Sequence, residues 1–263
     1  MKTLMLVRSL LILTFGCGCA IAQDVPNASK LKIGIIGDST VCNYPAGSRQ
    51  EGWGEELPSY FSADTTFLNT AEKGRSTKTF PAAHWKQILD FKPDYVLIQF
   101  GHNDSHEKSR PEATDAATDF RENLKRYIAE ARASGIVAVL VTPVHRRTFD
   151  ESGHLTTELE PYVTAMREVA KEVDTPLVDL YQASGVFFES LGEKASDTLT
   201  MNTVSNADQQ GKPDRTHFTT KGAKAIAGLV ATELAKVDPK LMAAVLPSMS
   251  ASSSTPAIPP TNP

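Results

Sequence analysis

Hydrophobic positions along the chain fall into two patterns, short unbroken runs and longer periodic segments. Five of the short runs are apolar over almost their whole length, and three of these are rich in β-branched residues. Such a composition is typical of strands that are covered on both faces of a sheet. We therefore predict β-strands at Leu31–Ile36, Thr66–Asn69, Asp94–Phe100, Ile136–Val141 and Pro176–Leu180.

The periodic segments lie between these runs and place their apolar residues on one face of a helix. They predict helices at residues 115–133, 157–173 and 220–236. Strands that alternate with helices form a parallel sheet with right-handed crossover connections. The expected fold class is therefore α/β, a three-layer α/β/α sandwich around a five-stranded parallel sheet of the flavodoxin-like plan.

The start of the chain has a different pattern. Lys2 and Arg8 give a basic beginning, an apolar stretch follows, and Ala20–Ala22 forms a small-x-small cleavage site before Gln23. This arrangement is typical of a secretory signal peptide and is too short for a membrane span. We expect residues 1–22 to be removed and the protein to be secreted or periplasmic.

Lipid modification of Cys17 or Cys19, which both lie inside this leader, is the alternative and would anchor the protein to a membrane. At the other end, residues 247–263 are rich in Ser, Pro and Thr and are expected to form a disordered tail. The folded domain is therefore predicted to span residues 23–246.

Composition and charge fit one ordinary globular domain, since the 263 residues are 41% hydrophobic and 22% charged. The net charge is −4, and it becomes −6 without the leader because residues 1–22 hold two basic residues and no acidic one. No basic face predicts nucleic-acid binding or stable membrane association. Cys42 is the one cysteine left after cleavage, so we expect a small buried thiol and no internal disulfide.

A candidate nucleophile stands where the first predicted strand ends. The apolar run closes on Gly37-Asp38-Ser39, which places a serine at the carboxyl edge of the sheet, where ligands bind in open α/β folds. A serine hydroxyl is a weak nucleophile until a base removes its proton. His217 is a candidate for that base, and Asp214 could hold the base in the required tautomer.

Each of these fragments also has a plainer interpretation. Gly-Asp-Ser alone could be a phosphate-binding turn or a helix cap, and Asp-x-x-His could be a helix cap with a surface histidine. An acyl-transfer enzyme additionally needs donors for an oxyanion. Ser39 and Gly74 could offer backbone N–H groups and Asn103 its side-chain amide, although Gly and Asn are also common in turns.

In this order along the chain, these residues resemble the blocks of the SGNH hydrolases, also called GDSL-type hydrolases, over nearly all of residues 31–236. The family is named for Ser, Gly, Asn and His. The resemblance implies Ser39 as the nucleophile, His217 as the base and Asp214 as the group that orients the base. The implied oxyanion hole consists of Ser39, Gly74 and Asn103. No cofactor is implied.

Within the family, the chain is most similar to the rhamnogalacturonan acetylesterases, whose substrates are acetylated pectic polysaccharides. The segments that carry this similarity are Gly37-Asp-Ser-Thr-Val41, Gly52-Trp-Gly54, Asn69-x-Ala71, Gly74-Arg-Ser-Thr77, Gln99-Phe-Gly-His-Asn-Asp104, Thr142-Pro-Val-x-Arg-Arg147 and Asp214-x-Thr-His-Phe218. The similarity implies a carbohydrate acetylesterase whose partner is an acetylated polysaccharide or oligosaccharide.

Substrate contacts are expected from Trp53, His102, Arg146 and Arg147, in part because guanidinium groups pair with the carboxylates of uronate sugars. Packing of Trp53 in the interior and a solvated face for the arginines are the alternatives. The two arginines lie in a long polar connection, residues 143–160, after the fourth predicted strand. Long connections at such strand ends are often functional.

His102 and His106, with Asp104 between them, have a spacing that would suit metal binding from a helix. Gly101 and Asn103 favour a loop here, and the ligand set is incomplete, so we expect no metal site. No role is predicted for the other three histidines outside the Asp-x-x-His segment, which are His84, His145 and His154.

Together these observations predict a secreted serine esterase that removes acetyl groups from cell-wall polysaccharide such as rhamnogalacturonan or pectin. Its reaction would pass through a Ser39 acyl-enzyme, which water activated by His217 would hydrolyse. A lipase or thioesterase of the same fold is one alternative, and a catalytically silent carbohydrate-binding module is another. Nothing in the sequence predicts an oligomeric state.

Overall fold

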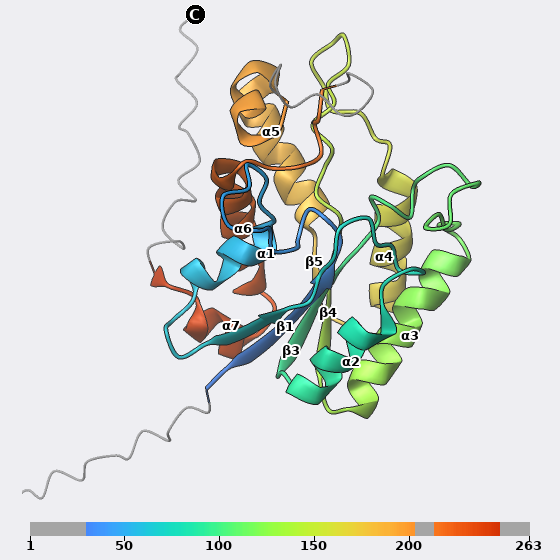
Figure 1. Cartoon of the computed structure of the whole chain (residues 1–263), viewed down its shortest axis with the longest axis vertical. Helices are drawn as coiled ribbons and strands as arrows, with labels where there is room; N and C mark the ends of the chain where they lie inside the picture. Colours follow the sequence, from blue (N-terminus) through green and yellow to red (C-terminus); the bar gives the residue numbers. More distant parts are fainter. Residues whose placement is uncertain (1–29, 203–212, 248–263) are drawn as a thin grey trace, which may run out of the picture.

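The computed structural model describes residues 30–202 and 213–247 (Figure 1). The leader predicted at residues 1–22 and the tail predicted at residues 247–263, apart from Pro247 itself, lie outside these ranges. Within them, no helix is both long enough and apolar enough to cross a membrane.

A five-stranded parallel sheet forms the centre of the fold, as predicted (Figure 1). Its strands are β1 Lys32–Gly37, β2 Thr66–Asn69, β3 Tyr95–Gln99, β4 Val137–Val141 and β5 Leu177–Val178. Their order across the sheet is β2-β1-β3-β4-β5, and every neighbouring pair is parallel. This is the flavodoxin-like order, and its switch point lies between β1 and β3.

Helices cover both faces of the sheet and complete the predicted three-layer sandwich (Figure 1). One face packs against α2 Ala82–Phe91, α3 Asp119–Ala133 and α4 Glu160–Glu172. The other face packs against α1 Trp53–Glu56, α5 Leu180–Ser196, α6 Thr220–Leu234 and α7 Pro239–Ala244. The 3₁₀ helices in contact with α6 are η1 Leu57–Tyr60 and η2 Asp197–Leu199.

The strands are buried on both sides because successive side chains point into two different cores. In β1, Ile33 and Ile35 pack in the core that includes α6, whereas Ile36 packs in the core that includes α2 and α3. All three side chains are fully buried. Burial of such a side chain stabilises the fold by about 1.5–3 kcal/mol relative to exposure. The unbroken apolar runs in the sequence therefore follow from a sheet that is covered on both faces.

The three predicted helices are present, but each is shorter than its periodic segment. α3 begins only after a turn in which the Asp115 carboxylate accepts the N–H of Ala117 at 2.9 Å. α6 begins after Thr219, whose hydroxyl accepts the N–H of Gly222 at 3.3 Å. These side-chain contacts to the backbone set the helix limits, which hydrophobic periodicity does not report.

The strand predicted at Pro176–Leu180 is too long because a helix begins inside it. β5 contains only Leu177–Val178, and Asp179 caps α5 by accepting the N–H of Gln182 at 3.3 Å. Neither α2 nor α5 is predicted from the sequence. The buried face of α5 nevertheless gives a helical pattern, carried by Leu180, Tyr181, Ser184 and Phe188.

Candidate active site

Ser39 lies in a tight turn at the carboxyl end of β1. The Asp38 carbonyl accepts the N–H groups of Val41 and Cys42 at 3.1 and 3.0 Å. Tyr44 donates its hydroxyl to the Ser39 carbonyl at 2.9 Å. These bonds fix the backbone on both sides of Ser39, whose side chain lines a pocket.

The structure brings the predicted Ser39, His217 and Asp214 into contact, although 178 positions separate the serine from the histidine. His217 Nε2 lies 2.8 Å from Ser39 Oγ, and His217 Nδ1 lies 2.9 Å from Asp214 Oδ2. The other oxygen of Asp214 accepts the N–H groups of Thr216 and His217 at 3.1 and 3.0 Å. An Nδ1 proton donated to Asp214 leaves Nε2 free to accept the proton of the Ser39 hydroxyl.

Asp214 is held as a carboxylate. Burial acts to raise its pKa, but the hydrogen bond and charge of His217, together with the N–H groups of His217 and Thr216, lower the pKa below its ordinary value. An ionised carboxylate stabilises the imidazolium that forms when a histidine base takes a proton. The three side chains are therefore arranged as a nucleophile, a base and a group that orients the base.

Asp214 and His217 lie on an irregular segment just before α6, and bonds to other loops hold this segment in place. The His217 carbonyl accepts the N–H of Met201 at 2.9 Å, and the Phe218 carbonyl accepts the N–H of Glu51 at 3.1 Å. The Phe218 side chain is buried in the core that includes α6. The base is thus positioned by contacts between regions far apart in sequence.

The prediction that Arg147 contacts substrate is wrong, because its side chain is fully buried. Its guanidinium binds four groups of the α5–η2 region, which are the Asp197 carboxylate, Thr200 Oγ1, Glu193 O and Ser196 Oγ. The backbone N–H of Arg147 donates to the Arg215 carbonyl at 3.2 Å. Arg147 therefore braces the segment that carries Asp214 and does not face the solvent.

The prediction that Trp53 contacts sugar is also wrong. Its side chain is fully buried, and its Nε1–H donates to Gln99 Oε1 at 2.9 Å. Its backbone N–H donates to the Thr40 carbonyl at 2.9 Å. Trp53 thus packs beneath the turn that carries Ser39, which is the alternative given by the sequence.

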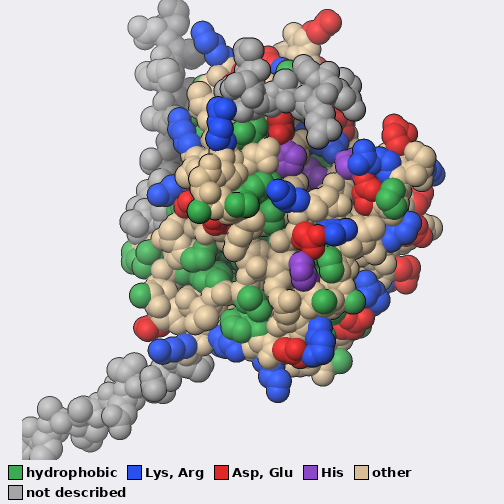
Figure 2. Space-filling view, in the orientation of Figure 1, with side chains coloured by type: hydrophobic (Ala, Val, Ile, Leu, Met, Phe, Trp, Pro, Cys, Tyr) green, Lys and Arg blue, Asp and Glu red, His purple; other side chains and the backbone are tan. Residues whose placement is uncertain are grey.

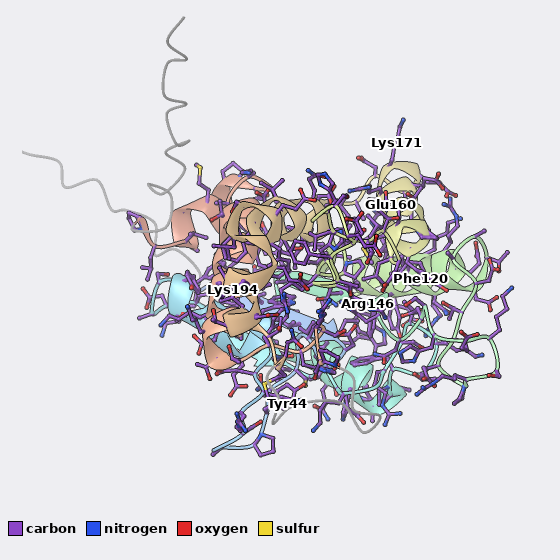
Figure 3. The ribbon with its side chains drawn as sticks, turned by 90° about the horizontal axis from the view of Figure 1, so that it is seen from above. Tyr44, Phe120, Arg146, Glu160, Lys171 and Lys194 are labelled. Atoms are coloured by element: carbon purple, nitrogen blue, oxygen red, sulfur yellow. The ribbon has the colours of Figure 1, made fainter. Side chains whose placement is uncertain are left out.

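His102 and Arg146 both line the pocket. His102 is only 4% exposed, and its ring nitrogens lie 3.3 Å from Asp38 Oδ2 and 3.0 Å from the Val144 carbonyl. Arg146 lies near the middle of the molecule when it is seen from above (Figure 3). Its guanidinium donates to the His102 carbonyl and to Glu158, each at 3.1 Å, which orients it at the pocket.

The loops after β2 and β3 place Gly74 and Asn103 at the same edge of the sheet as Ser39. Asn103 Nδ2 donates one proton to the Arg75 carbonyl at 2.9 Å, which ties the two loops together and leaves a second amide proton. Gly74 has a φ of +73°, a left-handed conformation that favours glycine. Asn103 also lines the pocket. An amide and backbone N–H groups at this edge are suited to stabilising an oxyanion.

Cys42 is a free and buried thiol, as predicted. Burial, with a further contribution from the charge of Asp38, raises its pKa to about 12. A thiol with so high a pKa stays protonated and is a poor nucleophile. Cys42 therefore belongs to the packing under the Ser39 turn.

The pocket around Ser39 has a volume of about 260 Å³. Figure 2 shows histidine side chains on the upper part of the visible face, with charged side chains near them. Besides the residues described above, the pocket is lined by His106, Pro213, Arg215 and Thr216. Nine of these ten lining residues have polar or charged side chains, and Pro213 is the exception.

His106 and Arg215 are pocket residues for which the sequence analysis predicted no catalytic or substrate-binding role. His106 Nδ1 lies 2.7 Å from Glu112 Oε1, which also accepts from Arg110 Nε at 2.6 Å. The hydrogen bond from His106 outweighs burial and, with Arg110, lowers the pKa of Glu112 to about 2. In the sequence, His106 was marked by its spacing from His102 and Asp104, which suggested a metal ligand, and its nearness to Asn103 could have suggested a role in the pocket.

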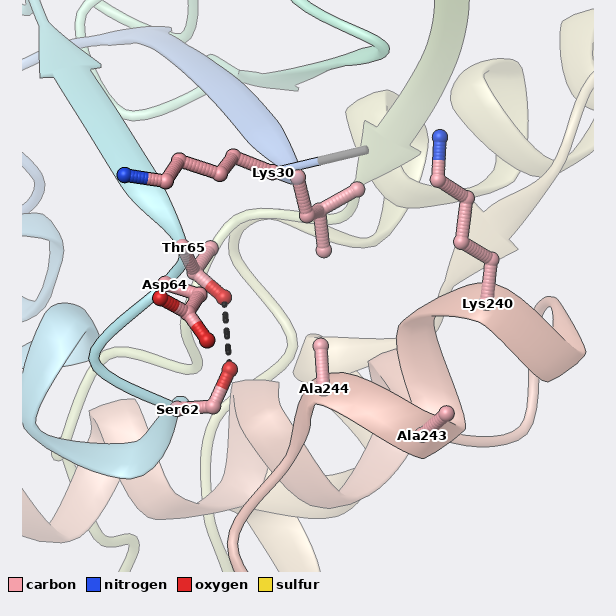
Figure 4. A pocket seen from close by; sticks show the side chains of 8 residues that line it. Lys30, Ser62, Asp64, Thr65, Lys240, Ala243 and Ala244 are labelled. Atoms are coloured by element: carbon pink, nitrogen blue, oxygen red, sulfur yellow. Dashed lines mark hydrogen bonds between the residues drawn. The ribbon is translucent and has the colours of Figure 1, made fainter. Parts of the chain in front are cut away.

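A second pocket, of about 250 Å³, lies near the start of β1 (Figure 4). It contains Ser62 and Thr65, whose hydroxyl oxygens are 3.3 Å apart. None of its described lining residues is a histidine that could activate a hydroxyl, so the nucleophile–base pair distinguishes the first pocket. In the part of the chain that the structure describes, no three His, Cys, Asp or Glu side chains are grouped so as to hold a metal ion.

Comparison with known protein families agrees with this geometry. The family described as "GDSL-like Lipase/Acylhydrolase" matches residues 33–230. The chain belongs to this family. The resemblance to the SGNH, or GDSL-type, hydrolases is thereby confirmed, and this hydrolase acts on carboxylic esters.

Two proteins from Bacillus subtilis (strain 168) resemble this hydrolase over most of its length. "Probable rhamnogalacturonan acetylesterase YesY" is 39% identical over 201 residues, which cover 75% of this chain and 89% of YesY. "Rhamnogalacturonan acetylesterase RhgT" is 36% identical over 208 residues, which cover 76% of this chain and 88% of RhgT. The similarity to the rhamnogalacturonan acetylesterases within the family is therefore also confirmed.

Solved structures share the fold. The structure of YxiM from Bacillus subtilis aligns with a TM-score of 0.67 at 29% identity, over 79% of this chain and 56% of that one. Axe2, an acetylxylan esterase from Geobacillus stearothermophilus, aligns with a TM-score of 0.58 at 18% identity, over 78% of this chain and 94% of that one. At that identity the likeness to Axe2 is evidence for the fold alone.

Proposed function

We propose that this hydrolase is a secreted serine esterase that removes acetyl groups from acetylated cell-wall polysaccharide, with rhamnogalacturonan as its preferred substrate. The observation that carries the proposal is the 2.8 Å contact of Ser39 Oγ with His217 Nε2, supported by the 2.9 Å contact of His217 Nδ1 with Asp214. A hydroxyl, an imidazole and a carboxylate in this arrangement can carry out ester hydrolysis through an acyl-enzyme.

In the first half of the reaction, His217 Nε2 takes the proton of Ser39 while Oγ forms a bond to the acetyl carbonyl carbon. The carbonyl oxygen becomes an oxyanion, which the N–H groups of Ser39 and Gly74 and the second amide proton of Asn103 stabilise. The bond between the acetyl carbon and the sugar oxygen then breaks. His217 gives its proton to that oxygen, which leaves a sugar hydroxyl and an acetylated Ser39.

In the second half, His217 takes a proton from a water molecule whose oxygen attacks the acetyl carbon. The bond to Ser39 Oγ breaks, His217 returns a proton to Oγ, and acetate leaves. Asp214 holds the His217 tautomer and stabilises its charged form in both halves. Substrate, water and these side chains supply every atom and proton, so no cofactor is part of the proposal.

The character of the pocket supports a short acyl group. Among the lining residues that the structure describes, Pro213 is the one apolar side chain. An alkyl chain gains about 0.8 kcal/mol for each CH₂ group that it buries against apolar surface. Longer acyl chains therefore gain little in this pocket, which favours an acetylesterase over a lipase or a long-chain thioesterase.

Similarity to YesY and RhgT supports rhamnogalacturonan as the acetylated polymer. Arg146 and Arg215 add a physical reason, because their guanidinium groups line the pocket and can pair with galacturonate carboxylates, which the main chain of xylan lacks. Arg215 replaces Arg147 as the second arginine expected to contact the substrate, because the Arg147 side chain is buried. The net charge is −6 without the leader and would repel an anionic polymer, so the attraction must be local. Salt screens charge pairs at the surface, so the pairing should weaken with salt.

Export is a proposal that rests on residues 1–22. We expect the exported protein to begin at Gln23, which intact-mass measurement or N-terminal sequencing would show. A chain that begins at a lipid-modified Cys17 or Cys19 would contradict cleavage before Gln23 and would make the protein membrane-anchored.

The variant Ser39→Ala tests the nucleophile. Its kcat on a small acetyl ester should fall by on the order of 10⁶-fold, because the hydroxyl that forms the acyl-enzyme is gone. Circular dichroism and the melting temperature should show that the variant is folded. Turnover like that of the wild type in a folded variant would eliminate Ser39 as the nucleophile.

Acetate release from a panel of acetylated polysaccharides, beside a chain-length series of p-nitrophenyl esters, tests the substrate. We expect acetate esters to be hydrolysed faster than octanoate esters, and acetylated rhamnogalacturonan faster than acetylated xylan. Highest activity on octanoate would favour a lipase, and equal activity on xylan would remove the preference for rhamnogalacturonan. Polysaccharide binding without any ester hydrolysis would favour a binding module.

A further inference from the structure

Three loops of the active site meet at His102, and we propose that this histidine is a positioning residue. A protonated His102, paired with the carboxylate of Asp38, holds the nucleophile Ser39 and the oxyanion donor Asn103 at a fixed separation. This role rests on the proposed esterase function, because it belongs to the same site.

The two paired side chains are buried together beneath the Ser39 turn. Asp38 is fully buried, and His102 is nearly so. His102 Nδ1 lies 3.3 Å from Asp38 Oδ2, and Nε2 lies 3.0 Å from the Val144 carbonyl. Asp38, His102 and Val144 lie on the loops after β1, β3 and β4, so one imidazole ring connects the ends of three neighbouring strands.

The partners of His102 decide where its protons lie. A carbonyl oxygen only accepts hydrogen bonds, so Nε2 carries a proton that it donates to Val144. The Asp38 carboxyl group accepts from Thr40, through N–H at 2.9 Å and Oγ1 at 2.7 Å, and from Gln99 at 3.3 Å. Three such donors favour the ionised carboxylate, and a carboxylate next to Nδ1 requires a second proton on the ring. His102 is therefore an imidazolium.

The electrostatics of Asp38 agree with this assignment. Burial acts to raise its pKa, but the charge of His102 and the hydrogen bonds from His102 and Thr40 lower the pKa below its ordinary value. Two further groups face the pair from neighbouring loops, since Arg146 donates to the His102 carbonyl and the buried Asp104 lies close enough to interact with the charge of Asp38. Breaking a buried pair leaves one unpaired charge in the interior, so the pair has a strong tendency to stay closed.

Each member of the pair directly precedes a group that would touch the substrate. Asp38 precedes Ser39, and His102 precedes Asn103. A displacement of about 1 Å between groups that act on the same substrate can cost roughly 10²-fold in rate. Loss of the pair should therefore appear in kcat and leave KM little changed, which a purely structural role would not produce.

The variants His102→Gln and Asp38→Asn each break the pair, and the double variant removes both charges. On a small acetyl ester, we expect kcat to fall by about 10²-fold in each single variant. The double variant should lose less than the product of the two single effects, because neither charge is left unpaired. His154→Gln changes a histidine whose side chain is 75% exposed, and this matched control should keep the wild-type kcat. An unchanged kcat in a folded His102→Gln variant would overturn the positioning role.

Nitrogen NMR of the wild-type protein tests the pair without relying on the folding of any variant. With labelled imidazole nitrogens, the His102 ring should carry protons on both nitrogens, one donated to Asp38 and one to the Val144 carbonyl. A neutral ring with a single proton would overturn the ion pair. If the wild type hydrolyses no acetyl ester, the esterase proposal fails, and the NMR spectrum still decides whether the pair exists.

Discussion

The nucleophile side and the base side of this active site are held in different ways. On the nucleophile side, Ser39 follows directly from a central strand and lies over Asp38, Thr40 and Gln99, which are fully buried and hydrogen-bonded to one another. On the base side, His217 lies on an irregular segment before α6, which backbone bonds join to other loops.

This difference shows how each half depends on the rest of the fold. The pairing of β1 with β3 places Gly37 beside Gln99, so sheet register positions the turn that carries Ser39. A Cβ at Gly37 would lie 2.8 Å from the Gln99 carbonyl, so this close approach requires glycine. The position of His217, by contrast, depends on Arg147 and its partners near the end of α5.

After Ser39→Ala, the largest effect is expected on the base side, from Asp214→Asn. The amide has nearly the same shape but cannot hold the His217 tautomer or stabilise its charged form, so kcat should fall by about 10⁴-fold. Kinetics on a small acetyl ester, with the melting temperature as a check on folding, would measure this loss. A kcat near that of the wild type would mean that the backbone of the segment, and not the carboxylate, orients His217.

On the nucleophile side, Asn103→Ala should have a smaller effect. Loss of one oxyanion donor costs about 2.7–4 kcal/mol of transition-state stabilisation, which lowers kcat by about 10²–10³-fold. KM should rise much less than kcat falls, because the oxyanion exists only in the transition state and intermediate. A change of only a few-fold would instead assign Asn103 to holding the Gly74 loop through its bond to Arg75.

Arg147→Met tests whether the contacts of the buried Arg147 side chain position His217. Loss of its buried hydrogen bonds to charged and polar partners should lower the free energy of unfolding by about 1.5–3 kcal/mol. Looser attachment of the His217 segment should also lower kcat. Thermal denaturation and kinetics of the same preparation would measure both.

Arg126→Met is the matched control for that experiment, because Arg126 forms an exposed ion pair with Glu130 on α3. Its effect on stability should stay within about 0.5 kcal/mol. If Arg147→Met lowers the free energy of unfolding and leaves kcat unchanged, the position of His217 does not depend on the contacts of Arg147.

The smallest effect on activity is expected for Asp104 on the nucleophile side, where the prediction concerns how stability depends on pH. Its carboxyl group accepts the N–H and the hydroxyl of Thr77 and the hydroxyl of Thr114. Burial nevertheless raises its pKa to about 7. The folded protein then binds this proton more tightly than the unfolded chain. This proton therefore contributes to the free energy of unfolding. The contribution is complete below about pH 4 and is lost as the pH rises to about 7.

Asp104→Asn keeps an acceptor oxygen for Thr77 and Thr114 and cannot titrate. The melting temperature of the variant should therefore depend less on pH than that of the wild type between about pH 4 and about pH 7. Melting curves at a series of pH values would measure the two slopes. Equal slopes would contradict the raised pKa of Asp104.

The sequence by itself determined the layered α/β fold, because a sheet that is covered on both faces requires unbroken apolar strands. The strand Thr66–Asn69 was predicted with its observed bounds. The sequence also singled out Ser39, Asp214 and His217 from a strand end and a short spacing, and the structure brings their side chains into contact. Helix limits were less accurate, because turns such as that of Asp115 compete with the helix locally.

Only the tertiary structure decided which side chains face the pocket. Trp53 and Arg147 are residue types that often bind sugars and carboxylates, yet contacts with Gln99 and with Asp197 bury them. His106 and Arg215 line the pocket, although the sequence marked His106 only for its spacing from His102 and gave Arg215 no role. Hydrophobic periodicity reports which face of a strand or helix is buried. It does not report which loops meet at the sheet edge, because that depends on contacts between residues far apart in the sequence.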